Sequence, residues 1–113
     1  MADYQPITAD RAFILESVLG ASGQWQQLAP FADIDAALAR QVLEESGRFV
    51  SAVIAPLNRV GDTIGAQFKD GAVTMPPGFA DAYRQFWQGG WPALAAEPAH
   101  GGQGLPAVLE AQL

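Results

Sequence analysis

Cysteine is absent from this 113-residue sequence, and histidine occurs only once, as His100. Without cysteine the chain forms no disulfide, supplies no thiolate to a metal and carries no thiol nucleophile. A hydrolytic zinc site normally takes three protein ligands, whereas Glu97 and His100 make only half of such a site. We therefore interpret His100 as an exposed loop residue and expect no metal site. The lack of cysteine also fits a reducing compartment, and we expect a cytoplasmic protein.

Positive charge is also scarce. Six lysine and arginine residues stand against twelve aspartate and glutamate residues, which gives a net charge of −6. Because the six are scattered, and phosphate backbones and anionic lipids reward clustered positive charge, we expect no nucleic acid and no polybasic membrane attachment. The first six residues contain no lysine or arginine, so we expect no secretory signal. No apolar run approaches the roughly 20 residues of a membrane span.

Apolar residues make up 50% of the chain and charged residues only 16%, a composition that argues against extensive disorder. The length allows one modest domain with a single core. Stretches of helical hydrophobic periodicity alternate with segments that contain many of the 12 glycines and 8 prolines. The sequence therefore predicts an all-α fold, a short helical bundle with Gly/Pro-rich loops.

The first predicted helix covers residues 9–19. Thr8 is a plausible N-cap, and Gly20 follows the helix where a C-terminal glycine is favoured. Four apolar residues share one face of this helix: Phe13, Ile14, Val18 and Leu19. Between Gly20 and Pro30 we predict a loop that contains Trp25.

The second predicted helix, residues 36–55, has the most regular pattern. Asp33 or Asp35 can cap it, and Pro56 should end or kink it. Glu44 and Arg48 form an i,i+4 pair on its polar side. The apolar stripe consists of Leu38, Val42, Phe49 and Val53, widened by Leu43, Val50, Ile54 and Leu57.

The remaining pattern is less regular. Residues 58–78 are interpreted as an ordered loop, because strands of three or four residues beside Asp70-Gly71 would make only a marginal hairpin. A third helix begins near Gly78 and stops at Gly89-Gly90, and a last one begins near Pro106. The third helix has an apolar stripe, which we interpret as core, with an acyl or flavin contact surface as the alternative. The stripe consists of Phe79, Ala82, Tyr83, Phe86 and Trp87.

Three local patterns have possible chemistry, and each has a simpler interpretation. The run from Gly102 to Ala107 matches G-x-G-x-x-G/A, but that fingerprint needs a preceding strand and a later acidic residue, so a glycine turn fits better. Asp33 and Asp35 resemble the start of a calcium loop that lacks its glycine and its glutamate, so they fit a helix cap better. Ser46 and Ser51 have no base nearby in the sequence.

A set of loop motifs, in this order and spacing, is similar to the amino-terminal region of acyl-CoA dehydrogenases. The residues are Ala55-Pro56-Leu57-Asn58, Gly61, Asp62, Gly71, Val73, Pro77-Gly78-Phe79, Ala82, Tyr83, Gly90 and Trp91, followed by Glu97-Pro98-Ala99-His100-Gly101-Gly102-Gln103-Gly104-Leu105-Pro106. The final Gln-Gly-Leu-Pro, with Tyr4, Pro6, Phe13, Leu15, Val18 and Leu19 near the start, resembles a subgroup of larger members. His100 departs from the family, which often has an aromatic residue there.

The resemblance implies a multidomain flavoenzyme. Acyl-CoA dehydrogenases have a helical amino-terminal domain, a β-domain and a helical carboxy-terminal domain, which hold FAD and the acyl thioester between them. In the family a glutamate removes the α-proton, the β-hydrogen leaves as hydride to the flavin, and electrons pass to an electron-transfer flavoprotein. Residues 1–113 would then be a truncated amino-terminal domain, with an extension over 1–30 and the helical domain proper, incomplete at its C-terminus, over 31–113.

The family's flavin-contacting motif and catalytic glutamate lie after the matched region, so the resemblance assigns no catalytic, cofactor-binding or metal residue here. Neither Glu97 nor Glu110 corresponds to that base. We expect FAD, acyl-CoA and the flavoprotein acceptor to belong to a full-length, homo-oligomeric enzyme, and no FAD in this fragment. The fragment should be inactive alone and form a structural wall of the substrate cavity. The alternatives are a free-standing acidic helical protein-interaction module and a small-molecule carrier that uses the aromatic stripe.

Overall fold

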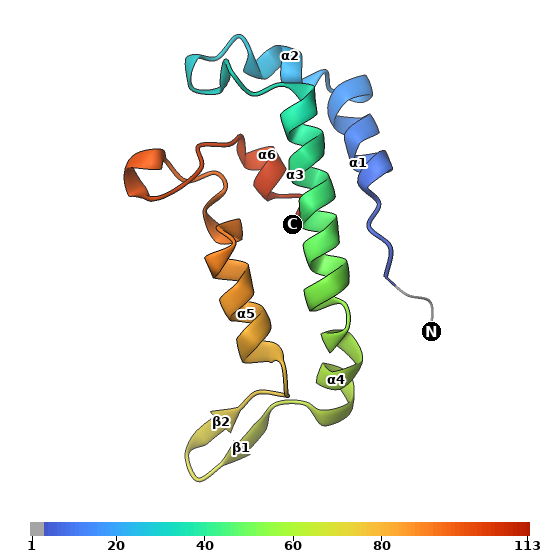
Figure 1. Cartoon of the computed structure of the whole chain (residues 1–113), viewed down its shortest axis with the longest axis vertical. Coiled ribbons are helices and arrows are strands. Elements are labelled where there is room, and N and C mark those ends of the chain that lie inside the picture. The colour runs from blue at the N-terminus through green and yellow to red at the C-terminus, as the bar shows by residue number, and fades with distance from the viewer. Residues whose placement is uncertain (1–3) are drawn as a thin grey trace.

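One long helix runs through the middle of the computed structural model, which describes residues 4–113 (Figure 1). Helix α3 spans Ala36–Phe49, and a π-helical turn, Val50–Ile54, continues it. Pro56 then stands at the N-cap of α4, Leu57–Ile64, because proline has no N–H with which to continue the hydrogen-bond ladder. The predicted second helix is confirmed, and so is its end at Pro56.

The start of α3 is held by one of the two aspartates that the sequence offered. Asp35 has an extended backbone, and its Oδ1 accepts a hydrogen bond from the amide of Leu38 at 2.8 Å. This bond satisfies one of the amides that a helix leaves unpaired in its first turn. On the exposed side of the helix, Arg48 pairs with Glu44 at 3.8 Å, as predicted, and also with Glu45.

We expect Asp35→Ala to lower the free energy of unfolding of this chain by about 1 kcal/mol, because the capping acceptor is lost. Asp33→Ala is the matched control, since Asp33 is also exposed and accepts no bond from the first turn among the described contacts. Urea denaturation of both variants measures the difference. Equal effects of the two substitutions would contradict the assignment of the cap.

The amino-terminal segment forms two short helices where the sequence predicted one helix and a loop. Helix α1, Thr8–Phe13, continues as a π-helical turn, Ile14–Val18, which confirms the first helix. Thr8 is not its N-cap, because the helix starts one residue earlier, and Ile7 occupies that position without a side-chain bond. Gly20 has a left-handed conformation (φ 58°) and separates the π-helical turn from α2, Ala21–Trp25, which lies within the predicted loop.

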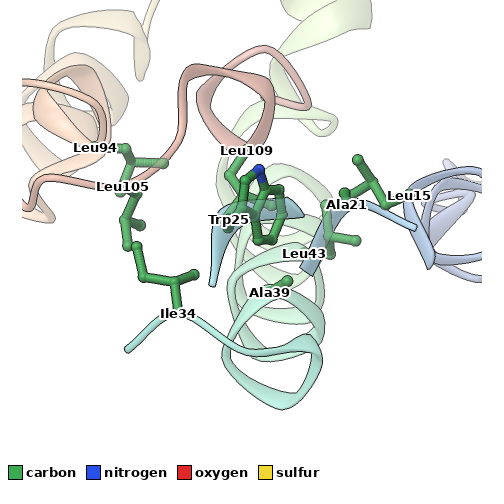
Figure 2. Packing of buried hydrophobic residues seen from close by; sticks show 9 residues of the cluster. All are labelled: Leu15, Ala21, Trp25, Ile34, Ala39, Leu43, Leu94, Leu105 and Leu109. Carbon is green, nitrogen blue, oxygen red and sulfur yellow. The ribbon is translucent and has the colours of Figure 1, made fainter. Parts of the chain in front are cut away.

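The core lies around the first half of α3 and is drawn from segments far apart in the sequence. Figure 2 shows Trp25 in the middle of this group, with Leu109, Leu43 and Ala39 around it and Leu15 at one side. The buried members are Leu15, Ala21, Trp25, Ile34, Ala39, Leu43, Leu94, Leu105 and Leu109. Helix α6, Ala107–Glu110, thereby packs on α3, and Arg11 Nη1 donates to the carbonyl of Gln112 at 2.7 Å.

The face that the sequence assigned to the first helix is not the buried one. Leu15 is only 2% exposed, whereas Phe13, Ile14, Val18 and Leu19 are between 50% and 62% exposed. The π-helical turn that starts at Ile14 closes with i→i+5 bonds, as in the bond from the Leu19 amide to the Ile14 carbonyl (3.0 Å). Regular 3.6-residue spacing therefore does not describe which residues of this segment share a face.

The second half of the chain contains a β-hairpin where the sequence predicted an ordered loop. Strand β1, Gln67–Lys69, pairs antiparallel with β2, Ala72–Thr74, with Phe68 opposite Val73. Asp70 (φ 51°) and Gly71 (φ 77°) both have positive φ, which is the geometry of a two-residue type I′ turn. The interpretation as a loop was wrong, and it also missed α4, because each element is too short for a periodic pattern.

Helix α5, Phe79–Gln88, follows Gly78 and ends at Gly89, as predicted. The ring of Phe49 at the end of α3 holds it in place, with centroids 6.3 Å from the Phe86 ring and 5.8 Å from the Trp91 ring. Pro106, expected in the first turn of the last helix, is instead the N-cap of α6. The chain is mostly helical, which confirms the predicted fold class. Within residues 4–113, no helix is both long and apolar enough to cross a membrane.

Candidate functional site

The glycine-rich loop that matches the dinucleotide pattern is folded onto itself. The amides of Gly102, Gln103 and Gly104 donate to the carbonyls of Glu97 (3.1 Å), Ala93 (3.0 Å) and Ala96 (2.9 Å), in that order. A 3₁₀ turn, Pro98–His100, precedes them instead of a strand. Because these amides are already bonded within the loop, they are not directed at a phosphate. The segment is the glycine turn that the sequence analysis favoured.

The two glutamates near this loop lie in different settings. Glu110 Oε2 accepts a hydrogen bond from the Ala95 amide at 2.8 Å, so its carboxylate ties α6 to the chain before the loop. Glu97 is exposed, and its Oε2 lies 3.9 Å from Nδ1 of the equally exposed His100. Among residues 4–113, no group of three or more acidic or histidine side chains lies close enough to hold a metal ion. Glu97 and His100 remain an isolated surface pair.

The other candidates from the sequence are not brought together. Asp35 is the cap of α3, and Asp33 lies exposed beside it. The hydroxyl of Ser46 donates to the carbonyl of Leu43 at 2.9 Å within the same helix, a bond that satisfies a buried hydroxyl rather than activating it. Ser51 lies one turn further on, in the π-helical turn. The described chain thus shows no nucleophile paired with a base at these positions.

One concave surface of the described chain is an apolar hollow of about 790 Å³. Residues of α4, of the end of the β-hairpin and of the aromatic stripe of α5 line it, and these elements lie in the lower part of Figure 1. We call it the α4–α5 hollow. Its lining residues are Ile54, Leu57, Asn58, Gly61, Asp62, Ala66, Met75, Pro76, Phe79, Ala82, Tyr83 and Phe86. Its polar side-chain groups are those of Asn58, Asp62 and the hydroxyl of Tyr83, and the rest of the lining is apolar, so the hollow suits apolar groups.

The aromatic stripe of α5 is only partly core. Ala82 is buried, and Phe79 and Phe86 are half-buried, whereas Tyr83 is 67% and Trp87 is 54% exposed. Helix α5 therefore directs much of its apolar face into the hollow and to solvent. The interpretation of the stripe as simple core was wrong for Tyr83 and Trp87, because no described element covers them.

Two glycines set how closely α4 and α5 approach each other. A Cβ added to Gly61 on α4 would lie 2.8 Å from Cζ of Phe79, and one added to Gly78 would lie 2.8 Å from Cδ2 of Leu57. Gly78 also has a φ of 89°, which favours glycine. The absence of a side chain at both positions lets α4 and the start of α5 approach closely beside the hollow.

A second hollow, of about 490 Å³, separates α1 from α3 and is more polar. Glu16 lines it, with Arg40 and Glu44 on the α3 side. Glu16 Oε2 accepts a hydrogen bond from Ser22 Oγ at 2.6 Å, while Oε1 is buried without a partner among the described residues. The sequence analysis missed Glu16, and no local pattern could have identified it, because its surroundings come from three separate segments.

The described residues do not fit a flavin. The dinucleotide-like loop has its amides bonded internally, and the basic side chains that could meet a pyrophosphate are distributed over α1, α3, α4, β1 and α5. Arg11, Arg40 and Arg48 lie on α1 and α3, and Arg59, Lys69 and Arg84 lie on α4, β1 and α5. A flavin site, if the protein has one, must be built mainly from other residues.

No protein-family model matches the chain. In contrast, 3-methylmercaptopropionyl-CoA dehydrogenase of Ruegeria pomeroyi is 41% identical to it over 111 residues, which is 96% of this chain. The resemblance to acyl-CoA dehydrogenases is confirmed. The chain spans 18% of the length of this acyl-CoA dehydrogenase. The subgroup of larger members that the first and last motifs resemble is the one that includes 3-methylmercaptopropionyl-CoA dehydrogenase.

The motifs behind the acyl-CoA dehydrogenase resemblance fall where the chain turns. Gly71 closes the hairpin, Gly78 precedes α5, Gly90 follows it, and Gly101 and Gly104 shape the loop before α6. All five glycines have positive φ, between 65° and 89°. In this chain the family-like residues therefore set the path of the backbone, and they do not gather around a reacting group.

Proposed function

We propose that residues 1–113 are the amino-terminal helical domain of an FAD-dependent acyl-CoA dehydrogenase, which introduces an α,β double bond into an acyl-CoA thioester. The observation that carries the proposal is the 41% identity across 96% of the chain. Residues 1–30 would be an extension and 31–113 the domain proper, incomplete at its C-terminus. The extension would contribute Leu15, Ala21 and Trp25 to the common core.

The role of this domain is architectural. Its helices would form one wall of the substrate cavity, while the flavin, the catalytic base and most contacts to the thioester come from parts of the protein outside the chain. The internally bonded glycine loop and the absence of a nucleophile–base pair at the candidate positions support this division. The whole enzyme would be a cytoplasmic homo-oligomer that passes electrons to an electron-transfer flavoprotein. The chain alone would be inactive.

The test uses the purified full-length protein, expressed from its native gene. We expect it to reduce an artificial electron acceptor in the presence of 3-methylmercaptopropionyl-CoA or another short acyl-CoA, and to form the matching 2-enoyl thioester, as detected by mass spectrometry. A reaction without thioester is the control. A folded full-length protein that oxidises none of a series of acyl-CoA thioesters would contradict the proposal. A native polypeptide that ends near Leu113 would instead support the free-standing interaction module.

A further inference from the structure

We propose that the α4–α5 hollow is the docking site of another part of the same protein, outside these 113 residues, and that polypeptide side chains fill it. The inference rests on the proposed function, because it takes the chain to be one domain of a longer enzyme. It names the face by which that domain joins the rest. The argument uses the shape of the chain, its exposed surface and the position of its apolar side chains.

The chain is a thin layer. Its principal extents are 55, 37 and 16 Å, and its radius of gyration is 17.1 Å, whereas a compact domain of this length has a radius of gyration of about 13 Å. A helix with its side chains is roughly 10–12 Å across. Stable domains consist of two or more packed layers around one core. Among residues 4–113 no second layer covers α4 and α5, since the buried core lies around the first half of α3.

The surface area supports the same conclusion. The chain exposes 7652 Å², but a compact monomer of 11.9 kDa exposes only about 5,900 Å² by the usual scaling with mass. The excess is about 1,700 Å², roughly twice what one partner buries in a standard protein–protein interface. An excess of this size fits contact with another folded domain and exceeds what a small ligand would cover.

Part of the exposed apolar surface lies at and around the hollow, and another part lies on the amino-terminal segment at Phe13, Ile14, Val18 and Leu19. Tyr83 and Met75 line the hollow, and both are more than half exposed. The hairpin extends the surface, because its cross-strand pair, Phe68 and Val73, is 75% and 65% exposed. Exposed apolar side chains grouped on neighbouring elements in this way are typical of an interaction site. Because this group reaches beyond the hollow onto the hairpin, one acyl chain would leave much of it uncovered.

The rest of the protein is a better occupant than a second copy of the chain. Each copy carries a net charge of −6, and Asp62 lies in the lining of the hollow, so two copies meeting here would bring like charges together. The relative is several times longer than the chain, which leaves ample polypeptide to form the missing layer.

Thiol labelling of the full-length protein tests the proposal. Because residues 1–113 contain no cysteine, Tyr83→Cys and Met75→Cys place single reporters in the hollow. Gln88→Cys is the matched control, because it lies on the same helix, is exposed and does not line the hollow. Mass spectrometry of the tryptic peptides follows the reaction with a maleimide. We expect both hollow positions to react about tenfold or more slowly than position 88, since labelling then requires local opening.

The outcomes separate the possible occupants. Equal labelling of all three positions in the full-length protein would overturn the proposal. Protection that appears only on addition of an acyl-CoA would assign the hollow to the substrate, and protection that grows with protein concentration would assign it to a second copy; either result would also overturn it. Thiol protection without acyl-CoA oxidation would support the docking site and contradict the proposed function alone. Hydrogen exchange of α5 in the unmodified protein provides a check that does not depend on the substitutions.

Discussion

Gly102→Ala is expected to destabilise the domain by about 3 kcal/mol or more, because the new Cβ has no space. An alanine side chain at this position would overlap the backbone carbonyl of Ala96, which cannot move aside as a flexible side chain can. The same carbonyl accepts the Gly104 amide at 2.9 Å, so relief of the overlap would open the loop before α6. Urea denaturation followed by tryptophan fluorescence measures the loss.

Gly23→Ala is the control for this substitution. Gly23 lies in α2, and a Cβ added there would meet no atom within 4 Å. We expect an unchanged or slightly higher free energy of unfolding, by up to about 1 kcal/mol, because alanine restricts the unfolded chain more than glycine does. If Gly102→Ala were tolerated as well as Gly23→Ala, the loop between Trp91 and Leu105 would have a different path from the one described.

Leu15→Ala is expected to lower the free energy of unfolding of the 113-residue chain by about 2–5 kcal/mol, because it removes a buried side chain and leaves a cavity. Leu15 is 2% exposed and belongs to the core cluster with Trp25 and Leu43. Leu19→Ala is the matched control, since Leu19 is the same residue type, one turn later and 50% exposed. The control should change the stability by about 0.5 kcal/mol or less.

This pair also tests the π-helical turn that distinguishes the structure from the prediction made by regular helical spacing. If Leu19→Ala were the more damaging change, the face formed by Phe13, Ile14, Val18 and Leu19 would be the buried one, and the described register of the segment would be wrong. The measurement should be made at low protein concentration, so that association through exposed apolar surface does not mask the difference.

The sequence predicts well those elements whose structure is determined by residues within or next to the element itself. The stripe through Leu38 and Leu43 lies on α3, the cap at Asp35 directly precedes it, and the stop at Pro56 follows the π-helical turn that continues it; the structure confirms all three. Helix α5 between Gly78 and Gly89 is a second example. A long segment with regular apolar spacing and clear start and stop residues can be assigned as a helix without knowing its tertiary contacts.

The elements that the sequence misses are short or depend on distant contacts. Helix α2 has five residues and owes its place to burial of Ala21 and Trp25 against segments far along the chain. The strands have three residues each, although the Asp70-Gly71 turn between them does suggest a hairpin. In such cases a tertiary contact decides the structure, and single-sequence patterns do not contain it.

The candidate site shows the same division. The Gly102–Ala107 pattern is compatible with a phosphate loop and with a turn, and only the bonds of its amides to Glu97, Ala93 and Ala96 distinguish the two. The α4–α5 hollow depends on the relative placement of two helices that a hairpin separates in the sequence, and no motif encodes it. The family resemblance, by contrast, needs only residue order and spacing, which is why the sequence was sufficient to identify it.

We propose that these helices are an incomplete layer of a longer acyl-CoA dehydrogenase. The most direct test is the intact mass of the native polypeptide that contains this sequence, measured by mass spectrometry after purification from its source. The account predicts a mass several times the 11.9 kDa of residues 1–113, in keeping with the relative of which they match 18%. A stable native protein of about 11.9 kDa would contradict it.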